Sequence, residues 1–172
     1  VHHTLGETSP AILAYERALT VNPRHSQARV SLARLLIEDG RFDQAESLRE
    51  DSHALDPGLP DLHIESGHLY QATGRIEEAE ASYRDALDID PSFASAALGL
   101  ASCRSDRGDV DGAVDILERA SENHRHDPEL VEQLALLEGV RGNLEASIEL
   151  YRQLVELEPD NPSAWNNLAT QL

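Results

Sequence analysis

Small and turn-forming residues recur along this chain with a period of 34 residues. Glycine holds this spacing at Gly6, Gly40, Gly74, Gly108 and Gly142. Two further columns share the register: Pro23, Pro57, Pro91 and Pro159, with Arg125 in the missing slot, and Ala11, Ala45, Ala79 and Ala113, followed by Ser147. Three columns in one register indicate that the chain is built of internal repeats.

The apolar pattern inside a unit predicts two α-helices. Ile76, Ala79, Tyr83 and Ala86 follow one another at spacings of three and four, which places them on one face of a helix. The glycine between the two segments favours a tight turn, because glycine readily adopts positive φ. Proline cannot continue a helix and biases the residue before it away from helical geometry. Each unit is therefore predicted to be a helix, a turn, an antiparallel helix and a stop.

Numbering each unit from the third residue after its proline gives full units 26–59, 60–93, 94–127 and 128–161. The chain opens in a partial unit, 1–25, with a helix near 9–21, and closes in a half unit, 162–172. We predict ten helices, A and B alternating, in a single array over 1–172. Because both ends fall inside a unit and the last helix carries apolar columns, we expect a piece of a longer array, or one whose ends self-associate.

Other columns hold one residue type at a fixed position of the unit. They are Ala33, Gly67, Ala101, Ala135 and Ala169 at position 8, Tyr15, Tyr83 and Tyr151 at position 24, Ala18, Ala86 and Ala120 at position 27, and Trp165 and Leu168 at positions 4 and 7. This pattern resembles the tetratricopeptide repeat, which favours aromatic residues at positions 4, 11 and 24 and small residues at 8, 20 and 27. The resemblance implies an all-α fold, a right-handed α-solenoid of antiparallel helix pairs.

Several residues depart from that family pattern. Arg49 stands at an aromatic slot, Ser66 at a leucine slot, Arg104 and Glu138 at position 11, and Leu154 at a small slot. We expect local repacking there, with arginine stems packed on apolar surface and their charges in water.

Charge and composition narrow the possible partners. Asp and Glu number 32 against 14 basic residues, all of them Arg, which gives a net charge of −18. Nucleic acid and anionic lipid require positive charge, so neither is an expected partner. No apolar run reaches the roughly 20 residues of a membrane span, and the opening residues lack the apolar core of a signal peptide. We therefore expect no membrane insertion and a cytoplasmic location.

The residues with chemical potential do not form a catalytic or metal-binding pattern. Cys103 takes position 10, where other units have leucine, and is interpreted as a small buried hydrophobe. His63 and His68 are five residues apart, roughly 140° around a helix, whereas a helical metal pair needs one face. His124 and His126 fall in a loop. We predict no catalytic residue, no metal and no cofactor, and hence a chain that is not an enzyme.

In the family the A helices line the concave surface, and positions 2, 5, 9 and 12 resemble its peptide-contact set. The candidate groove residues are Gln27, Val30, Arg34, Ile37, Asp61, Ile64, His68, Gln71, Ser95, Leu98, Ser102, Glu129, Glu132 and Leu136. Position 5 is apolar at Val30, Ile64 and Leu98, and two interpretations stay open: an apolar strip that anchors a ligand, or ordinary core.

Two specialised versions of the family are not matched. The Lys, Asn and Arg clamp for a C-terminal carboxylate is absent, and the asparagine ladder at position 6 keeps only Asn167.

The function most consistent with the sequence is a protein-interaction scaffold that binds a partner peptide or helix in the concave groove. The candidate groove residues, which we call the stripe, include acidic side chains with apolar residues between them. This composition favours a partner that is basic and apolar. Two alternatives stay open. One is a substrate-recruiting or regulatory arm of a larger enzyme, a glycosyltransferase, sulfotransferase or hydroxylase whose catalytic domain lies outside this chain. The other is a homo-oligomeric assembly module.

Overall fold

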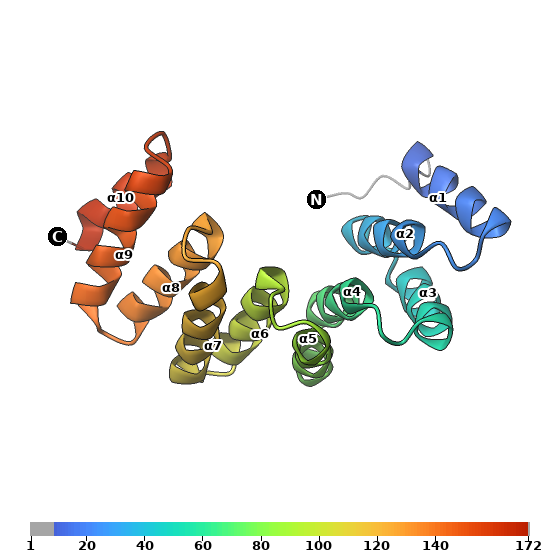
Figure 1. The fold of residues 1–172 in the computed structure, drawn as a ribbon, viewed down its shortest axis with the longest axis horizontal. Coiled ribbons are helices and arrows are strands. Elements are labelled where there is room, and N and C mark those ends of the chain that lie inside the picture. Colours follow the sequence, from blue (N-terminus) through green and yellow to red (C-terminus); the bar gives the residue numbers. More distant parts are fainter. Residues whose placement is uncertain (1–8, 172) are drawn as a thin grey trace. The chain divides into compact units, whose positions relative to one another are not determined.

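The computed structural model describes residues 9–171, except for the side chain of Asn123, and contains only α-helices and short connections over that range (Figure 1). Gly6 of the glycine column lies outside the described residues. The helices are α1 (Pro10–Val21), α2 (Ser26–Glu38), α3 (Phe42–Leu55), α4 (Pro60–Ala72), α5 (Ile76–Ile89), α6 (Ala94–Asp106), α7 (Val110–Asn123), α8 (Pro128–Val140), α9 (Leu144–Leu157) and α10 (Pro162–Gln171). The all-α class and the ten alternating A and B helices are confirmed.

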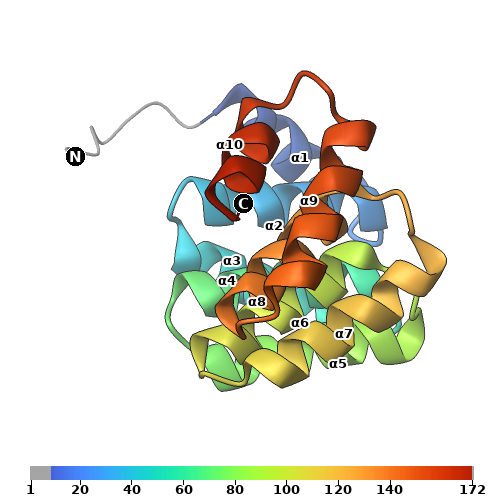
Figure 2. The ribbon, with the colours of Figure 1, turned by 90° about the vertical axis from the view of Figure 1, so that its left-hand side faces the viewer.

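The chain divides into two compact units, and the division falls inside α5. Unit 1 extends to Ser82 and holds α1 to α4 with the start of α5. Unit 2 begins at Tyr83 and holds the rest of α5 with α6 to α10. In unit 2, α8 and α9 lie side by side in both views (Figures 1 and 2).

Every A–B turn within the described residues closes in the same way. The four turn glycines all have positive φ, from 72° at Gly40 to 85° at Gly142. The residue after each glycine donates its backbone N–H to a carbonyl five residues back, as from Arg41 to Leu36 at 2.8 Å and from Asp109 to Arg104 at 2.9 Å. This is the Schellman motif, in which glycine avoids the steric cost of a Cβ in the left-handed region. The predicted role of the glycine column is confirmed.

The ends of the B helices follow the proline column. α1 and α3 end two residues before Pro23 and Pro57, respectively. α7 ends at the same distance before Arg125, although no proline is present there. In that loop the His124 ring Nε2 lies 2.6 Å from the carbonyl oxygen of Ser92, and Gln153 donates to the Arg125 carbonyl at 2.8 Å. Tertiary hydrogen bonds therefore hold this loop of unit 2 in place.

Small side chains occupy the contacts between helices. In the position 20 column, Ala45 is 1% exposed, and Ala79, Ala113 and Ser147 are each 0% exposed. Helix axes approach closely where such residues meet, and larger residues fill the space beside them. Cys103 is fully buried, as expected for a small hydrophobe.

Polar residues at position 11 are paired with residues of the following turn. Arg104 donates to Asp109 at 2.6 Å, and Arg141 donates to both oxygens of the buried Glu138 at 2.7 Å. The Arg104 hydrogen bond, and then the Gly112 backbone N–H, lower the pKa of Asp109. Ion pairing thus replaces the aromatic contact that the family pattern has at this position.

Arginines of three turns also reach a carboxylate of the preceding B helix. Their pairs are Arg41 with Glu16 at 4.0 Å, Arg75 with Glu46 at 3.6 Å and Arg141 with Asp111 at 3.7 Å. Exposed pairs of this kind contribute little to stability, because water and salt screen the attraction. They place positive charge beside carboxylates in a chain of net charge −18.

Gly99 is a position where the close packing of unit 2 can be tested. A Cβ added to Gly99 would overlap the ring of Tyr83, which is 0% exposed. Overpacking of this kind lowers the free energy of unfolding by about 1–3 kcal/mol. The higher helix propensity of alanine offsets only about 1 kcal/mol of that loss. We predict that Gly99→Ala lowers the free energy of unfolding by about 1–2 kcal/mol, measured by urea denaturation.

Gly58→Ala is the matched control, because a Cβ at Gly58 meets nothing within 4 Å and its φ is not positive. We expect a change within about 0.5 kcal/mol there. A Gly99→Ala variant as stable as the control would contradict the tight contact with Tyr83.

Candidate functional site

The candidate groove residues of unit 1 lie on α2 and α4, and they differ in exposure. Gln27 and Arg34 are exposed, and Ile37 is half-buried. Val30 and Ile64 are each only 5% exposed. Of the two interpretations that the sequence left open for position 5, the structure therefore favours the core for these two residues. The remaining candidates on α4, Asp61, His68 and Gln71, are half-buried.

Arg34 is held by a buried carboxylate of the next A helix. Its Nε and Nη2 donate to Glu65 Oε1 at 2.9 and 2.7 Å, and the Glu65 side chain is 3% exposed. This hydrogen bond and the attraction of the carboxylate raise the pKa of Arg34 above its ordinary value. His68 Nδ1 lies 3.4 Å from the other oxygen of Glu65. The guanidinium of Arg34 therefore links α2 to α4 within unit 1.

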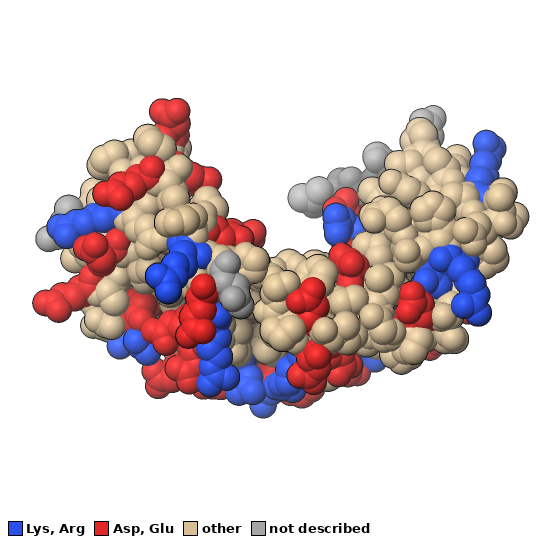
Figure 3. Space-filling view, in the orientation of Figure 1, with Lys and Arg blue, Asp and Glu red and all other residues tan. Residues whose placement is uncertain are grey.

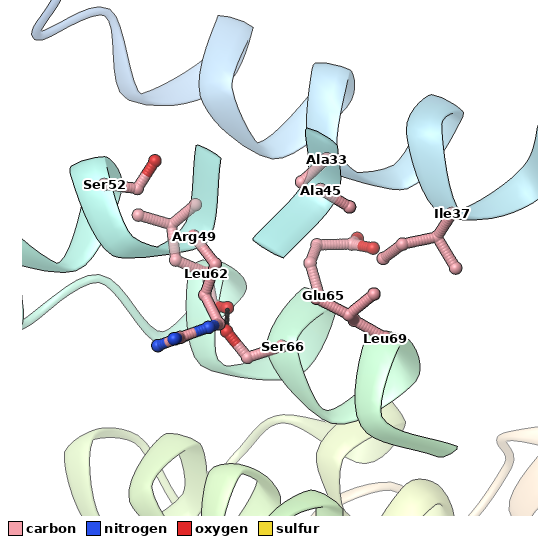
Figure 4. A pocket seen from close by; sticks show the side chains of 9 residues that line it. All are labelled: Ala33, Ile37, Ala45, Arg49, Ser52, Leu62, Glu65, Ser66 and Leu69. Carbon is pink, nitrogen blue, oxygen red and sulfur yellow. Dashed lines mark hydrogen bonds between the residues drawn. The ribbon is translucent and has the colours of Figure 1, made fainter. Parts of the chain in front are cut away.

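A cavity beside this pair is too small for a ligand (Figure 4). Its volume is about 10 Å³, which suits a single water molecule. The lining residues are Ala33, Ile37, Ala45, Arg49, Ser52, Leu62, Glu65, Ser66 and Leu69. Arg49 and Ser66 stand where the family pattern has an aromatic residue and a leucine. Smaller and more polar side chains at these columns explain the loose packing.

Removal of Arg34 tests the pair. A fully buried pair that loses one partner costs about 3–5 kcal/mol, but the Arg34 side chain is 58% exposed and water screens its charge. We predict that Arg34→Met lowers the free energy of unfolding by about 1–2 kcal/mol, measured by urea denaturation.

Arg17→Met, which also removes an exposed arginine of unit 1, is the control and should change stability by less than about 0.5 kcal/mol. The double variant Arg34→Met with Glu65→Leu should be more stable than Arg34→Met alone, since no buried charge is left without a partner. An unchanged stability of Arg34→Met would contradict a structural role of the pair.

Ser52 allows a second test of unit 1. Its side-chain oxygen is buried and has no hydrogen-bond partner among the described residues. Position 27, which Ser52 occupies, holds alanine in Ala18, Ala86 and Ala120. We predict that Ser52→Ala raises the free energy of unfolding by about 0.5–1 kcal/mol, measured by thermal and urea unfolding, because a buried unpaired hydroxyl is costly. A loss of stability would show that this hydroxyl has a partner.

In unit 2 the candidate groove residues lie on α6 and α8 and are more accessible. Ser95, Ser102 and Glu129 are exposed, and Leu98 and Glu132 are half-buried. Leu136 is 42% exposed.

A cleft of about 230 Å³ separates α6 from α8, and we call it the α6–α8 cleft. It is lined by Leu98, Ala101, Ser102, Ser105 and Asp106 of α6, Leu117 of α7, and Gln133 and Leu137 of α8. Two of the candidate residues, Leu98 and Ser102, meet in it. Glu129, Glu132 and Leu136 are not among its lining residues.

The sequence did not predict every residue of this cleft. Gln133 and Asp106 are exposed and Leu137 is buried, and all three line the α6–α8 cleft from positions 6, 13 and 10 of their units. Val140, at position 13, is 69% exposed and lies four residues after Leu136, so the two share one face of α8. The signal was available in the sequence, since an apolar residue one turn beyond position 9 extends the same face.

This surface combines apolar contact with negative charge. Leu136 and Val140 offer exposed apolar contact, and Asp106 and Glu129 add exposed negative charge. Among residues 9–171 the structure shows no group of three or more His, Cys, Asp and Glu side chains placed to hold a metal ion. None of the described helices has the length and apolar character that a membrane crossing requires.

Comparison with known proteins identifies the repeat. A family model described as tetratricopeptide repeat matches residues 5–50, 37–84 and 72–137, and one described as TPR repeat matches residues 141–170. The human protein O-mannosyl-transferase TMTC1 is 26% identical over 98% of this chain. The chain spans only 19% of the length of that relative.

Solved structures with the same fold include two TPR proteins. A thermophilic TPR protein of Thermus thermophilus superposes with a TM-score of 0.79 at 23% identity, covering 93% of this chain and 88% of that one. YrrB, described as a TPR protein with an unusual peptide-binding site, superposes with a TM-score of 0.71 at 19% identity, covering 92% of this chain and 81% of that one. At these identities the likeness concerns the fold alone.

Proposed function

Because this chain belongs to the tetratricopeptide repeat family, we propose that it is a protein-interaction scaffold that binds a segment of a partner protein through its A helices. The observation that carries the proposal is the accessible apolar face of α8 beside the α6–α8 cleft. Leu136 and Val140 are exposed one turn apart on one helix face, and together they offer apolar contact area to a partner segment. The peptide-binding site in the description of YrrB adds support from a protein of the same fold.

The partner segment that fits this surface combines apolar side chains with lysine or arginine. Leu136, Val140 and Leu98 supply apolar contact, and Asp106 and Glu129 supply negative charge. Apolar contact contributes most of the affinity, and complementary charge orients the segment and speeds its association. In unit 1 the stripe is less suited to this role, because Val30 and Ile64 are buried and Arg34 pairs with Glu65.

Photo-crosslinking from within the α6–α8 cleft tests the proposal. A benzoylphenylalanine placed at Gln133 is expected to capture a partner segment whose sequence, determined by mass spectrometry, is apolar with Lys or Arg. An acidic segment captured from this position would contradict the proposed charge preference.

We predict that Leu136→Glu weakens binding of that captured segment about tenfold or more, as measured by isothermal titration calorimetry, because it places a charge in an apolar contact. Leu13→Glu is the matched control. The exposed fraction of Leu13, 44%, is close to the 42% of Leu136, but Leu13 lies on the B helix α1. Binding should also weaken as salt rises, since part of the attraction is screened. The proposal fails if Leu136→Glu binds as tightly as the parent while Leu13→Glu does not bind.

A second function is favoured by the relative TMTC1, which is named as a transferase and is about five times longer than the matching region. In this alternative the repeats recruit a substrate or regulator to a catalytic domain outside this chain. Deleting residues 26–161 from the parent protein would then reduce turnover of a protein substrate and leave that of a short peptide substrate unchanged. Equal turnover of both substrates would contradict the alternative.

A further inference from the structure

A second cleft in unit 2 arises from a departure in the repeat pattern. Position 4, which the family pattern fills with an aromatic residue and which holds Trp165 in the last helix, is Ala97 in α6. A cleft of about 340 Å³ opens at Ala97, between the C-terminal half of α5 and α7, and we call it the α5–α7 cleft. Its apolar lining consists of Leu87, Pro91, Ala97, Leu100, Ile116 and Ala120.

The α5–α7 cleft is separate from the α6–α8 cleft. Ala97 and Leu100 line the former, whereas Leu98, Ala101 and Ser102 line the latter, so the two clefts use different faces of α6. The B helices form the walls of the α5–α7 cleft. Its volume falls in the range of about 300–1,000 Å³ that is usual for ligand sites.

The rim of this cleft holds two arginines and one aspartate, whereas the chain as a whole is acidic. Arg84, Asp88 and Arg119 border it, and all three are exposed, in a chain whose net charge is −18. Within residues 9–171, Arg119 forms no hydrogen bond or ion pair with another described residue. Side chains of both signs gather along the lower edge of Figure 3, where Figure 1 places α5 and α7.

We propose that the α5–α7 cleft is a second docking site, which takes a partner segment with one bulky apolar or aromatic side chain flanked by carboxylates. The apolar side chain would fill the space that Ala97 leaves open, and the carboxylates would face Arg119 and Arg84. This preference is opposite to that of the α6–α8 cleft, where the accessible charges are acidic. The two sites therefore select different segments.

Two fluorescein-labelled peptides serve as probes. They share the core Leu-Phe-Leu and differ in their flanks, which are two Glu on each side in one and two Lys on each side in the other. Binding to the whole chain is followed by fluorescence anisotropy, and the site is mapped by amide chemical shifts in nitrogen-15 NMR spectra. The Glu-flanked peptide is expected to shift amides of α5 and α7 around Leu87 and Ile116. The Lys-flanked peptide is expected to shift amides along the α6–α8 cleft.

Two variants and one control test the contacts. Ala97→Trp fills the cleft with the residue found at the same position of the last helix, and it should abolish binding of the Glu-flanked peptide. Arg119→Glu reverses a rim charge and leaves the floor unchanged, and it should weaken that binding on the order of five- to tenfold. Arg125→Glu makes the same charge change at an exposed residue that does not line the cleft, and it should have a smaller effect.

The proposal is overturned if the Glu-flanked peptide does not bind at millimolar concentration, or if its shifts map to the α6–α8 cleft. It is also overturned if Ala97→Trp, with its NMR spectrum showing an intact fold, binds like the parent, or if Arg125→Glu weakens binding as much as Arg119→Glu. Binding of the Lys-flanked peptide reports separately on the proposed function of the A helices.

Discussion

Small side chains at the contacts between helices are the constraint on which the rest of this protein depends. Ala79, Ala113 and Ser147 are fully buried at one position of the repeat, and the space they leave is filled by larger residues such as Tyr83 and Tyr151. Packed helices with axes about 8–10 Å apart leave little room for an added methyl group at these contacts.

The features that the sequence predicted are those set by local geometry. Glycine at a positive φ and proline after a helix end act within a few residues, so their spacing alone located the ten helices. Leu98 and Ser102 were also predicted on the stripe, and they do line a cleft. These residues belong to one helix face, which periodicity describes well.

The features that the sequence did not predict depend on contacts between units of the repeat. Val30 and Ile64 have the same position as Leu98, yet they are buried and Leu98 is only half-buried, because the neighbours around each residue differ. Arg34 and Glu65 are 31 residues apart, and their pairing needs two A helices to be brought together. A single sequence does not contain the side-chain geometry that decides such contacts. The cleft at Ala97 likewise depends on which neighbours fail to fill the space.

The fully buried thiol of Cys103 has a consequence for how this protein can be studied. It is the single cysteine of the chain and lies at 0% exposure on α6. A thiol in that position reacts with an aromatic disulfide reagent only when the surrounding helices separate, so its modification rate reports the local opening of unit 2. The modification rate of Cys103 therefore measures how often the helices packed around α6 separate, with no added label or probe.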